Sequence, residues 1–318
     1  MAKSNKVTDV AKSLKNRYQY MHRDVKENIE YYLMMSIPLL SLVVFKFFPA
    51  YGMLIAFQNY VPGAPILGEG AKWVGLKWMK QIVRDPYIWR GIVNSLRLFA
   101  IGTLFMFAPV FFAVLTAEVR NRKFQGFTRI FCYMPNFMSE IVVCGFFIGM
   151  LQTTGIITQM VAAMGFKVTN LLTVPAAFPW IYTIINCWQS FGWGSLLYSA
   201  AIAGIDPGLY ESAQIDGAGK MAQIWHVTLP ALKPMIIYSF IMRFSGMLGS
   251  DVTQIIRMYN SSVYSVADTI GSYLYRETLL GSRYSYGSAA GLMISVINFI
   301  ALYVCNKICQ KVSEFSMW

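Results

Sequence analysis

One run of residues has part of the composition of a phosphate-binding loop. In Gly217-Ala218-Gly219-Lys220, a lysine directly follows a glycine turn, and such a loop can hold phosphate oxygens with backbone N–H groups and the lysine ammonium. The complete motif also needs a glycine five positions before the second glycine and a Ser or Thr after the lysine. Gln214 and Met221 occupy those positions, so we do not expect this chain to hydrolyse ATP itself.

Other residues that commonly do chemistry are sparse. The chain has two histidines, His22 and His226, and neither belongs to an HExxH motif; no GxSxG motif is present either. The five cysteines lie in or beside apolar segments, and their spacing forms neither a disulfide framework nor a zinc site. We therefore expect no catalytic residues, no metal and no cofactor in this chain.

The residues before the glycine turn predict a short helix. Within residues 205–234, IDPGLYESAQIDGAGKMAQIWHVTLPALKP, Asp206 is a good N-cap and Pro207 suits the first helical position. The helix should run to about Asp216 and present Glu211 on its surface.

The residues after the turn predict a second short helix. Gly217-Ala218-Gly219 permits a sharp change of direction. The following helix should stop at Leu229-Pro230 and Pro234, because proline interrupts helical hydrogen bonding. Residues 205–234 should therefore form a compact helix–turn–helix.

The remainder of the chain has the composition of a membrane protein. Hydrophobic residues make up 56% of the sequence and charged residues only 13%, about half the charged share of a soluble domain. Several apolar runs are long enough to cross a hydrocarbon core. We predict an all-α, polytopic membrane protein with six transmembrane helices, near residues 31–56, 92–117, 130–151, 178–203, 235–256 and 286–306.

Charge places the glycine turn on the cytosolic side. With the amino terminus inside, the inner segments carry 15 Lys and Arg against 9 in the outer segments, as the positive-inside rule favours. Residues 1–30 should form a basic cytosolic tail that is not cleaved, and residues 31–318 the transmembrane domain, with both termini in the cytosol. The net charge of +12 then reflects topology and contact with anionic lipids rather than nucleic-acid binding.

The outer segments and the helix faces carry further signals. Residues 57–91 should end in an amphipathic helix on the membrane surface, residues 152–177 should contain a short helix capped by Gly165, and residues 257–285 should form an irregular loop. Two GxxxG motifs, Gly145/Gly149 and Gly287/Gly291, indicate close helix packing within the chain or with a partner.

The helix–turn–helix resembles the cytoplasmic coupling motif of bacterial ABC importer permeases. That motif reads Glu-Ala-Ala, three residues, Gly, nine residues, then Ile-x-Leu-Pro; here it reads Glu211-Ser212-Ala213, Gly217 and Val227-Thr228-Leu229-Pro230 at the same spacing. The sequence departs from the pattern at Ser212 and Val227. Asp216 and Pro234 resemble the carbohydrate-uptake branch of the family.

The resemblance extends from about residue 35 to the end. DVTQIIRMYNSSVYSVADTIGSYLYRE, SYGSAAGL and Trp318 are similar to permeases for complex oligosaccharides in Gram-positive bacteria, and most similar to the lipoprotein-associated polysaccharide group.

The resemblance implies a machine of several chains in the bacterial cell membrane. This chain would pair with a second permease, two copies of a nucleotide-binding ATPase subunit would bind ATP and magnesium, and an extracellular solute-binding lipoprotein would deliver an oligosaccharide. The implied ATPase-coupling residues are Glu211, Ser212, Ala213, Asp216, Gly217, Leu229 and Pro230. ATP-driven closure would move this rigid turn and tilt the attached spans.

Sugars are recognised by aromatic faces together with hydrogen-bonding groups in a concave site. The fourth span is polar and aromatic, and in resembling sugar permeases the spans on either side of the coupling loop line the path. The candidate residues are Asn186, Trp188, Gln189, Trp193, Ser239, Met242 and Arg243, with Trp188 and Arg243 foremost.

Charges at membrane depth are costly and usually face a cavity or a partner. We expect Arg243 to pair with Glu140 or Asp251, and contact with an acidic sugar is the alternative role. An alternative for the whole protein is an ion-coupled secondary transporter, which would favour inverted repeats and acids at the midplane. No clear repeat is visible in this sequence.

Overall fold

The computed structural model describes residues 28–167, 169–249 and 252–313. Apart from one isolated bridge between Gln58 and Trp73, these residues form helices, turns and loops, as the predicted all-α class requires. The chain divides into two compact units, the first of residues 1–55 and 64–71 and the second of residues 56–63 and 72–318. Most of the predicted tail, residues 1–30, lies outside the described residues.

The first unit is a single apolar helical rod. It comprises α2 (Ile29–Leu42), a π-helical turn (Val43–Phe47), α3 (Phe48–Ala50) and the start of a 3-10 helix (Tyr51–Phe57). Its sequence is apolar almost throughout, with Lys46 as the one basic residue between Ile29 and Phe57. Pro38 lies inside α2. The rod corresponds to the first predicted span.

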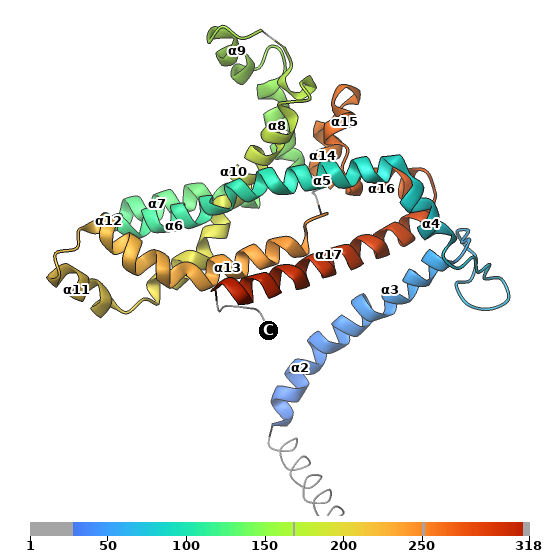
Figure 1. Cartoon of the computed structure of the whole chain (residues 1–318), viewed down its shortest axis with the longest axis horizontal. Coiled ribbons are helices and arrows are strands. Elements are labelled where there is room, and N and C mark those ends of the chain that lie inside the picture. Colours follow the sequence, from blue (N-terminus) through green and yellow to red (C-terminus); the bar gives the residue numbers. More distant parts are fainter. Residues whose placement is uncertain (1–27, 168, 250–251, 314–318) are drawn as a thin grey trace, which may run out of the picture. The chain divides into compact units, whose positions relative to one another are not determined.

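The second unit is built around long helices that run between two ends (Figure 1). The long helices are α5 (Pro86–Leu104) with α6 (Ala108–Glu118), α10 (Phe178–Ala203), α13 (Leu229–Ser245) and α17 (Tyr284–Ser313). Helix α10 packs against α6, and α13 packs against α17. The turn between α11 (Pro207–Ile215) and α12 (Lys220–Gln223) lies at one end, and α4 (Lys77–Arg84) lies at the other.

Three apolar clusters hold these helices together. Val143, Phe178 and Ile255 represent a cluster shared by α8 (Glu140–Leu151), α10 and α14 (Val252–Met258). A second cluster joins α4, α5, α16 (Ile270–Tyr275) and α17, and a third joins α6, α10 and α13. Helix α10, which is polar and aromatic, therefore packs in two of these clusters against other helices of the unit.

Among the described residues, five helices are long and apolar enough to cross a membrane, namely Ile29–Phe57, Pro86–Glu118, Glu140–Ala163, Lys220–Ser245 and Tyr284–Lys311. Helix α10 matches the predicted fourth span in its bounds and has 26 residues, but it is not among the five. Polar residues such as Asn186 and Gln189 lower its hydropathy. The predicted fourth span therefore forms a helix of the expected length, but its composition is too polar for a helix surrounded by lipid.

The predicted third span is wrong in its bounds. Residues 130–151 do not form one helix, because α7 (Arg122–Tyr133) ends in a 3-10 turn (Met134–Phe137) and α8 begins only at Glu140. Pro135 and the extended backbone at Met138 and Ser139 break the helical hydrogen bonding. Glu140 is consequently the first residue of a helix and not a mid-span acid.

Two other predictions about the outer end need correction. The fifth span does not reach residue 256, since α13 ends at Ser245 and Val252–Met258 forms a separate helix. Residues 257–285 are not an irregular loop but a chain of short helices, which includes α15 (Tyr264–Ala267) and α16. Thr269 caps α16 through a capping box with Ser272.

Two short helices form where they were predicted. Helix α9 (Ile156–Ala163) is followed by Gly165, whose φ is +90°, and α4 is a short helix with Ile82 buried and Lys77, Lys80 and Arg84 exposed. The GxxxG prediction for Gly145/Gly149 has no counterpart inside the described chain, because a Cβ at either glycine would meet nothing within 4 Å.

Candidate functional site

The turn at residues 205–219 has the predicted geometry. Asp206 accepts a hydrogen bond from the Gly208 N–H at 2.9 Å and caps α11. After the helix ends at Ile215, Gly217 adopts a φ of +78°, a conformation in which glycine is favoured. The Ala218 N–H then bonds to the Ala213 carbonyl at 2.8 Å, so the turn closes the helix end as glycine C-caps do.

The second half of the motif differs from the prediction. The helix after the turn does not stop at Leu229-Pro230 or Pro234, because α12, a π-helical stretch (Ile224–Thr228) and α13 are continuous. Pro230 stands in the first turn of α13 and Pro234 lies inside it. A π-turn is one way for a helix to absorb a local irregularity without ending. The coupling turn is therefore joined to a membrane helix without an intervening loop.

Two side-chain contacts hold the turn against the rest of the unit. The Tyr210 and Thr228 hydroxyls lie 3.0 Å apart and join α11 to the π-turn. Lys220 Nζ lies 3.0 Å from the Glu118 carboxylate at the end of α6. The turn is thus fastened to two membrane helices, α6 and α13, and a force on it can reach both.

The seven predicted coupling residues occupy different environments. Glu211, Asp216 and Gly217 are exposed. Ser212 is exposed too, but its hydroxyl donates to the Gly208 carbonyl of its own helix. Leu229 packs against the cluster of α6, α10 and α13, whereas Ala213 is half-buried and Pro230 is exposed.

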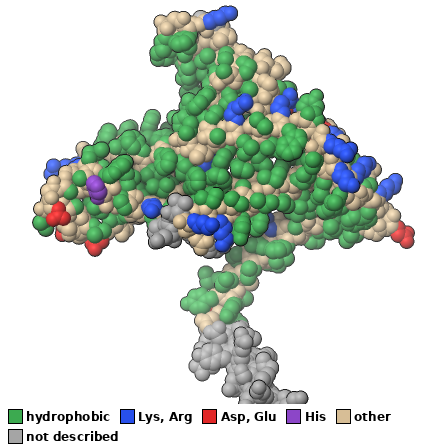
Figure 2. Space-filling view, in the orientation of Figure 1, with side chains coloured by type: hydrophobic (Ala, Val, Ile, Leu, Met, Phe, Trp, Pro, Cys, Tyr) green, Lys and Arg blue, Asp and Glu red, His purple; other side chains and the backbone are tan. Residues whose placement is uncertain are grey.

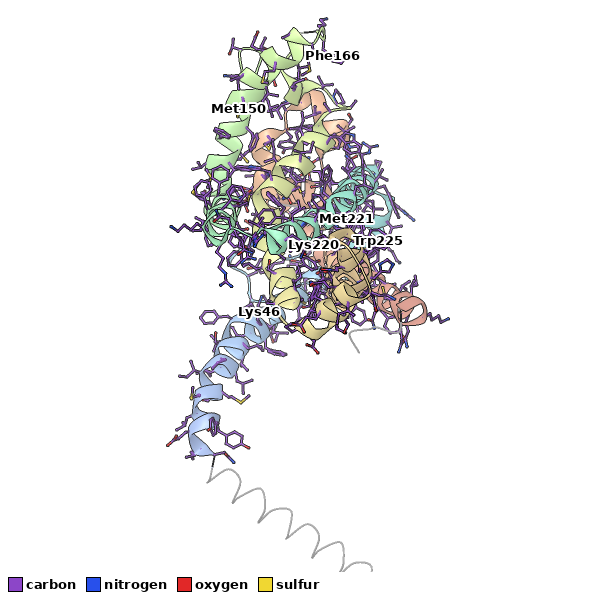
Figure 3. The ribbon with its side chains drawn as sticks, turned by 90° about the vertical axis from the view of Figure 1, so that its left-hand side faces the viewer. Lys46, Met150, Phe166, Lys220, Met221 and Trp225 are labelled. Carbon is purple, nitrogen blue, oxygen red and sulfur yellow. The ribbon has the colours of Figure 1, made fainter. Side chains whose placement is uncertain are left out.

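Sequence analysis missed an apolar part of the same surface. Ile215 is 87% exposed, Met221 76% and Trp225 68%. Figure 3 shows Met221 and Trp225 near Lys220, on the side of the molecule that faces the viewer. Exposed large apolar side chains in a cluster indicate a binding surface. The sequence could have indicated this surface, because Ile215, Met221 and Trp225 are large apolar residues in a segment that was predicted to lie in the cytosol.

The fourth helix borders a polar cleft of about 530 Å³. Asn186, Gln189 and Ser190 of α10 line one side, and Ser139 and Glu140 at the start of α8 line another. The break in the predicted third span opens this cleft, because it leaves polar side chains and an extended backbone opposite α10. Two of the predicted path residues, Asn186 and Gln189, therefore share one site.

Arg243 lies in a neighbouring cavity of about 230 Å³, which Asn186 also lines. Its Nε donates to the Thr103 hydroxyl at 3.1 Å, its Nη2 lies 3.4 Å from the Phe99 carbonyl, and its guanidinium stands over the Phe99 ring. A Cβ at Gly102 would collide with Nη2. Gly102 is therefore a further site residue, which the sequence alone did not single out.

The expected pairing of Arg243 with Glu140 is not found. The ion pairs between described residues do not include Arg243, and Asp251 lies outside the described residues. The partners of Arg243 are the neutral oxygens of α5.

Four predicted path residues do not line the two cavities. Trp188 is half-buried and meets Phe147 edge to face at 5.3 Å, Trp193 meets Phe137 in the same way, Ser239 lies against the Tyr198 hydroxyl, and Met242 is exposed.

A buried ion pair fixes the opposite end of the unit. Asp268 is 2% exposed, and Arg276 holds both of its carboxylate oxygens, at 2.8 and 2.7 Å. Arg276 also donates to the Tyr259 hydroxyl at 2.9 Å. The hydrogen bonds that Arg276 donates to Asp268 raise the pKa of Arg276, and burial opposes them only in part. The short helices at this end are therefore organised around a permanent cation.

Residues 109–313 match the family of binding-protein-dependent transport system inner membrane components. The chain is 32% identical to the polygalacturonan/rhamnogalacturonan transport system permease protein YteP of Bacillus subtilis (strain 168), over 89% of this chain and 88% of that protein. It is 34% identical to protein LplB of the same strain, over 89% of each chain.

Two solved structures resemble the whole fold. The crystal structure of a bacterial ABC transporter involved in the import of the acidic polysaccharide alginate has a TM-score of 0.82 and 29% identity, and covers 92% of this chain and 99% of that one. The bacterial alginate ABC transporter in complex with its alginate pentasaccharide-bound periplasmic protein also has a TM-score of 0.82.

This chain belongs to the family of binding-protein-dependent transport system inner membrane components. It is a multi-pass transport permease of the cell membrane and not an enzyme, and the predicted class of ABC importer permease is confirmed. The ion-coupled alternative is accordingly set aside.

Proposed function

We propose that this chain is one of two permease subunits of an importer for an acidic oligosaccharide. An extracellular solute-binding lipoprotein delivers the substrate, and two copies of an ATPase subunit, which bind ATP and magnesium, drive transport from the cytosol. The relatives support the substrate class, since YteP is named for polygalacturonan and rhamnogalacturonan and the solved structures concern alginate, described as an acidic polysaccharide.

The observation that carries the substrate class is that no acidic side chain among the described residues forms an ion pair with Arg243, which lines the cavity. The guanidinium packs against Gly102, about halfway along the span Pro86–Glu118, so it lies deep within the helix bundle. A charge at that depth is retained where it meets a cavity or a partner. Arg243 and Asn186 present hydrogen-bond donors to the same cavity, and a sugar carboxylate accepts such bonds in a charge-assisted pair.

The ATPase contact is the surface formed by Glu211, Asp216, Ile215, Met221 and Trp225. It combines exposed acids with exposed apolar side chains, a mixture that suits an anchor residue surrounded by charged contacts. This surface is continuous with α13, which carries Arg243, and the neighbouring Lys220 forms an ion pair with Glu118 of α6, so that movement of the ATPase can be transmitted to both helices.

The test compares Arg243→Gln and Arg243→Lys in the complete importer, reconstituted in vesicles with its binding protein. Substrates are a uronate oligosaccharide and the same oligosaccharide with its carboxyl groups reduced to alcohols. Arg243→Gln should lower uptake of the acidic form at limiting concentration by about tenfold or more, because a charge-paired contact of about 2 kcal/mol is lost. Uptake of the reduced form should change little.

Arg243→Lys keeps the charge without the planar fork and should be intermediate. Equal losses for both substrates, or no loss for either, would refute the acidic-oligosaccharide assignment. Basal ATP hydrolysis by each variant shows whether the complex has assembled.

A further inference from the structure

An apolar groove of about 340 Å³ runs between the first halves of α5 and α17. Ile88, Ile92 and Leu96 line it from α5, and Met293, Ile294 and Ile297 line it from α17. Ile82 and Val83 of α4 also line it, beside the starts of both long helices. The groove shares none of its lining residues with the cavities that contain Arg243 and Asn186.

The chemistry of the groove excludes a sugar. Its lining side chains are all apolar apart from Trp89, and the Trp89 indole N–H is already bonded to the Val83 carbonyl at 2.9 Å. No lining side chain offers a hydrogen bond to a hydroxyl group. An empty apolar groove forfeits dispersion contacts along its walls, so a hydrocarbon occupant is favoured.

The residues around α4 have the character of a membrane–water boundary. Trp73, Tyr87 and Trp89 are each about half exposed, and exposed tryptophan and tyrosine gather at the level of lipid headgroups. Helix α4 buries Ile82 on one side. Both observations place the groove beside a membrane–water interface, directly below the headgroups.

The opposite face of α4 is cationic. Lys77, Lys80 and Arg84 follow the i, i+3, i+7 spacing of one helix face, and all three are exposed; basic side chains gather at this end of the molecule in Figure 2. The adjacent Asp85 forms no ion pair with these three residues, all of which are described; its carboxylate accepts hydrogen bonds from Tyr273 and Tyr286 at 2.8 and 2.5 Å. Helix α4 therefore lines the groove with one face and carries positive charge on the other.

We infer that this groove binds an acyl chain of an anionic phospholipid, whose phosphate group is held by the Lys80 and Arg84 side chains. The apolar side chains of the groove contact the hydrocarbon, and the basic face of α4 contacts the negatively charged headgroup. The two parts of the site thus match the two parts of one lipid. Anionic headgroups are attracted to such basic clusters beside a membrane helix. The bound lipid packs against α4, α5 and α17 at the α4 end of the permease.

The test uses the importer complex extracted from vesicles of equal parts phosphatidylglycerol and phosphatidylcholine, with retained lipid counted by native mass spectrometry. Ile297→Trp places a large side chain in the groove and should reduce retained phosphatidylglycerol by about tenfold, because several buried methylene groups lose their place. Val296→Trp is the matched control, since Val296 is exposed and does not line the groove; it should retain the lipid. Lys80→Gln with Arg84→Gln should retain a lipid without preference for phosphatidylglycerol.

Three results would overturn the inference. The first is equal lipid retention by Ile297→Trp and the wild type. The second is an equal loss from Ile297→Trp and Val296→Trp. The third is loss of the second permease from Ile297→Trp while the wild type retains no phosphatidylglycerol, which would assign the groove to a helix of that subunit. If Ile297→Trp fails to insert, Leu96→Trp approaches the groove from α5 and serves the same comparison.

Discussion

Gly217 is the residue on which the coupling turn depends for its backbone geometry. Its φ is +78° and a Cβ would meet nothing within 4 Å, so any penalty for a side chain comes from the backbone alone. We expect Gly217→Val to strain the turn by about 1–2 kcal/mol, to weaken ATPase binding and to reduce uptake. Co-purification of the ATPase and sugar uptake measure both effects.

Gly219 supplies the control for that experiment. It also has open space around it, but its φ is −68°, which alanine adopts without strain. Gly219→Ala should therefore leave uptake unchanged. Normal ATPase binding and uptake by Gly217→Val would mean that the turn tolerates a different geometry and is not the rigid coupling element.

Trp188 shows how a residue of the right type can have a structural role. The ring packs edge to face against Phe147 and contacts the apolar cluster of α8, α10 and α14. We expect Trp188→Ala to lower stability by about 2 kcal/mol, visible as an earlier thermal unfolding of the purified complex. Trp188→Phe should restore most of the loss.

The KM for uptake separates the two roles of Trp188. A structural residue changes the amount of folded complex, whereas a stacking surface for sugar changes the substrate concentration at half-maximal uptake. A raised KM in a variant of unchanged stability would return Trp188 to the substrate path.

At the scale of elements, α11 has nine residues, too few for stability in water without help from caps and packing. Asp206 provides that help by accepting from the Gly208 N–H. We expect Asp206→Ala to destabilise the helix by about 1 kcal/mol, and the amides of residues 207–215 should then exchange hydrogen roughly fivefold faster. Asp206→Asn keeps the cap and should exchange at the wild-type rate. Unchanged exchange in Asp206→Ala would mean that packing alone holds α11.

At the scale of the whole molecule, one face of α8 is not packed against any other described part of the chain. Gly145 and Gly149 of α8 lie on one helix face with no neighbour within 4 Å of a Cβ, and small residues at this spacing permit close approach of a second helix in lipid. The proposed second permease is the partner that this face fits. The chain should therefore be unstable when expressed alone and should form a stoichiometric complex with the second permease and the ATPase.

A size series at Gly145 tests the assembly. Gly145→Ala preserves a small side chain and should retain the second permease, whereas Gly145→Leu should reduce its co-purification several-fold because the helices cannot approach. The open space around Gly145 within the chain means that neither change should disturb folding. A stable single chain that transports sugar without ATP would contradict the assembly altogether.

Much of the fold follows from local patterns. The bounds of α10, the helix cap at Asp206, the turn at Gly217 and the helix end at Gly165 depend on residues within a few positions of each other, and all were predicted. The errors fall where tertiary contacts decide. Pro230 and Pro234 signal a stop, yet the helix continues, since a π-turn and packing against α6 and α10 hold it. Pro135, by contrast, stands where the predicted third helix breaks.

The sequence by itself determined the class of this protein, because apolar length, basic flanks and the spacing of Glu211, Gly217 and Pro230 are properties of the chain read in order. Only the tertiary structure decided which polar residues share a site. Asn186 and Arg243 stand 57 positions apart and meet because α10 packs against α13 and α5, whereas Trp188, two positions from Asn186, turns into the core. A helix turns by about 100° per residue, so neighbours in sequence face different surroundings that only packing assigns.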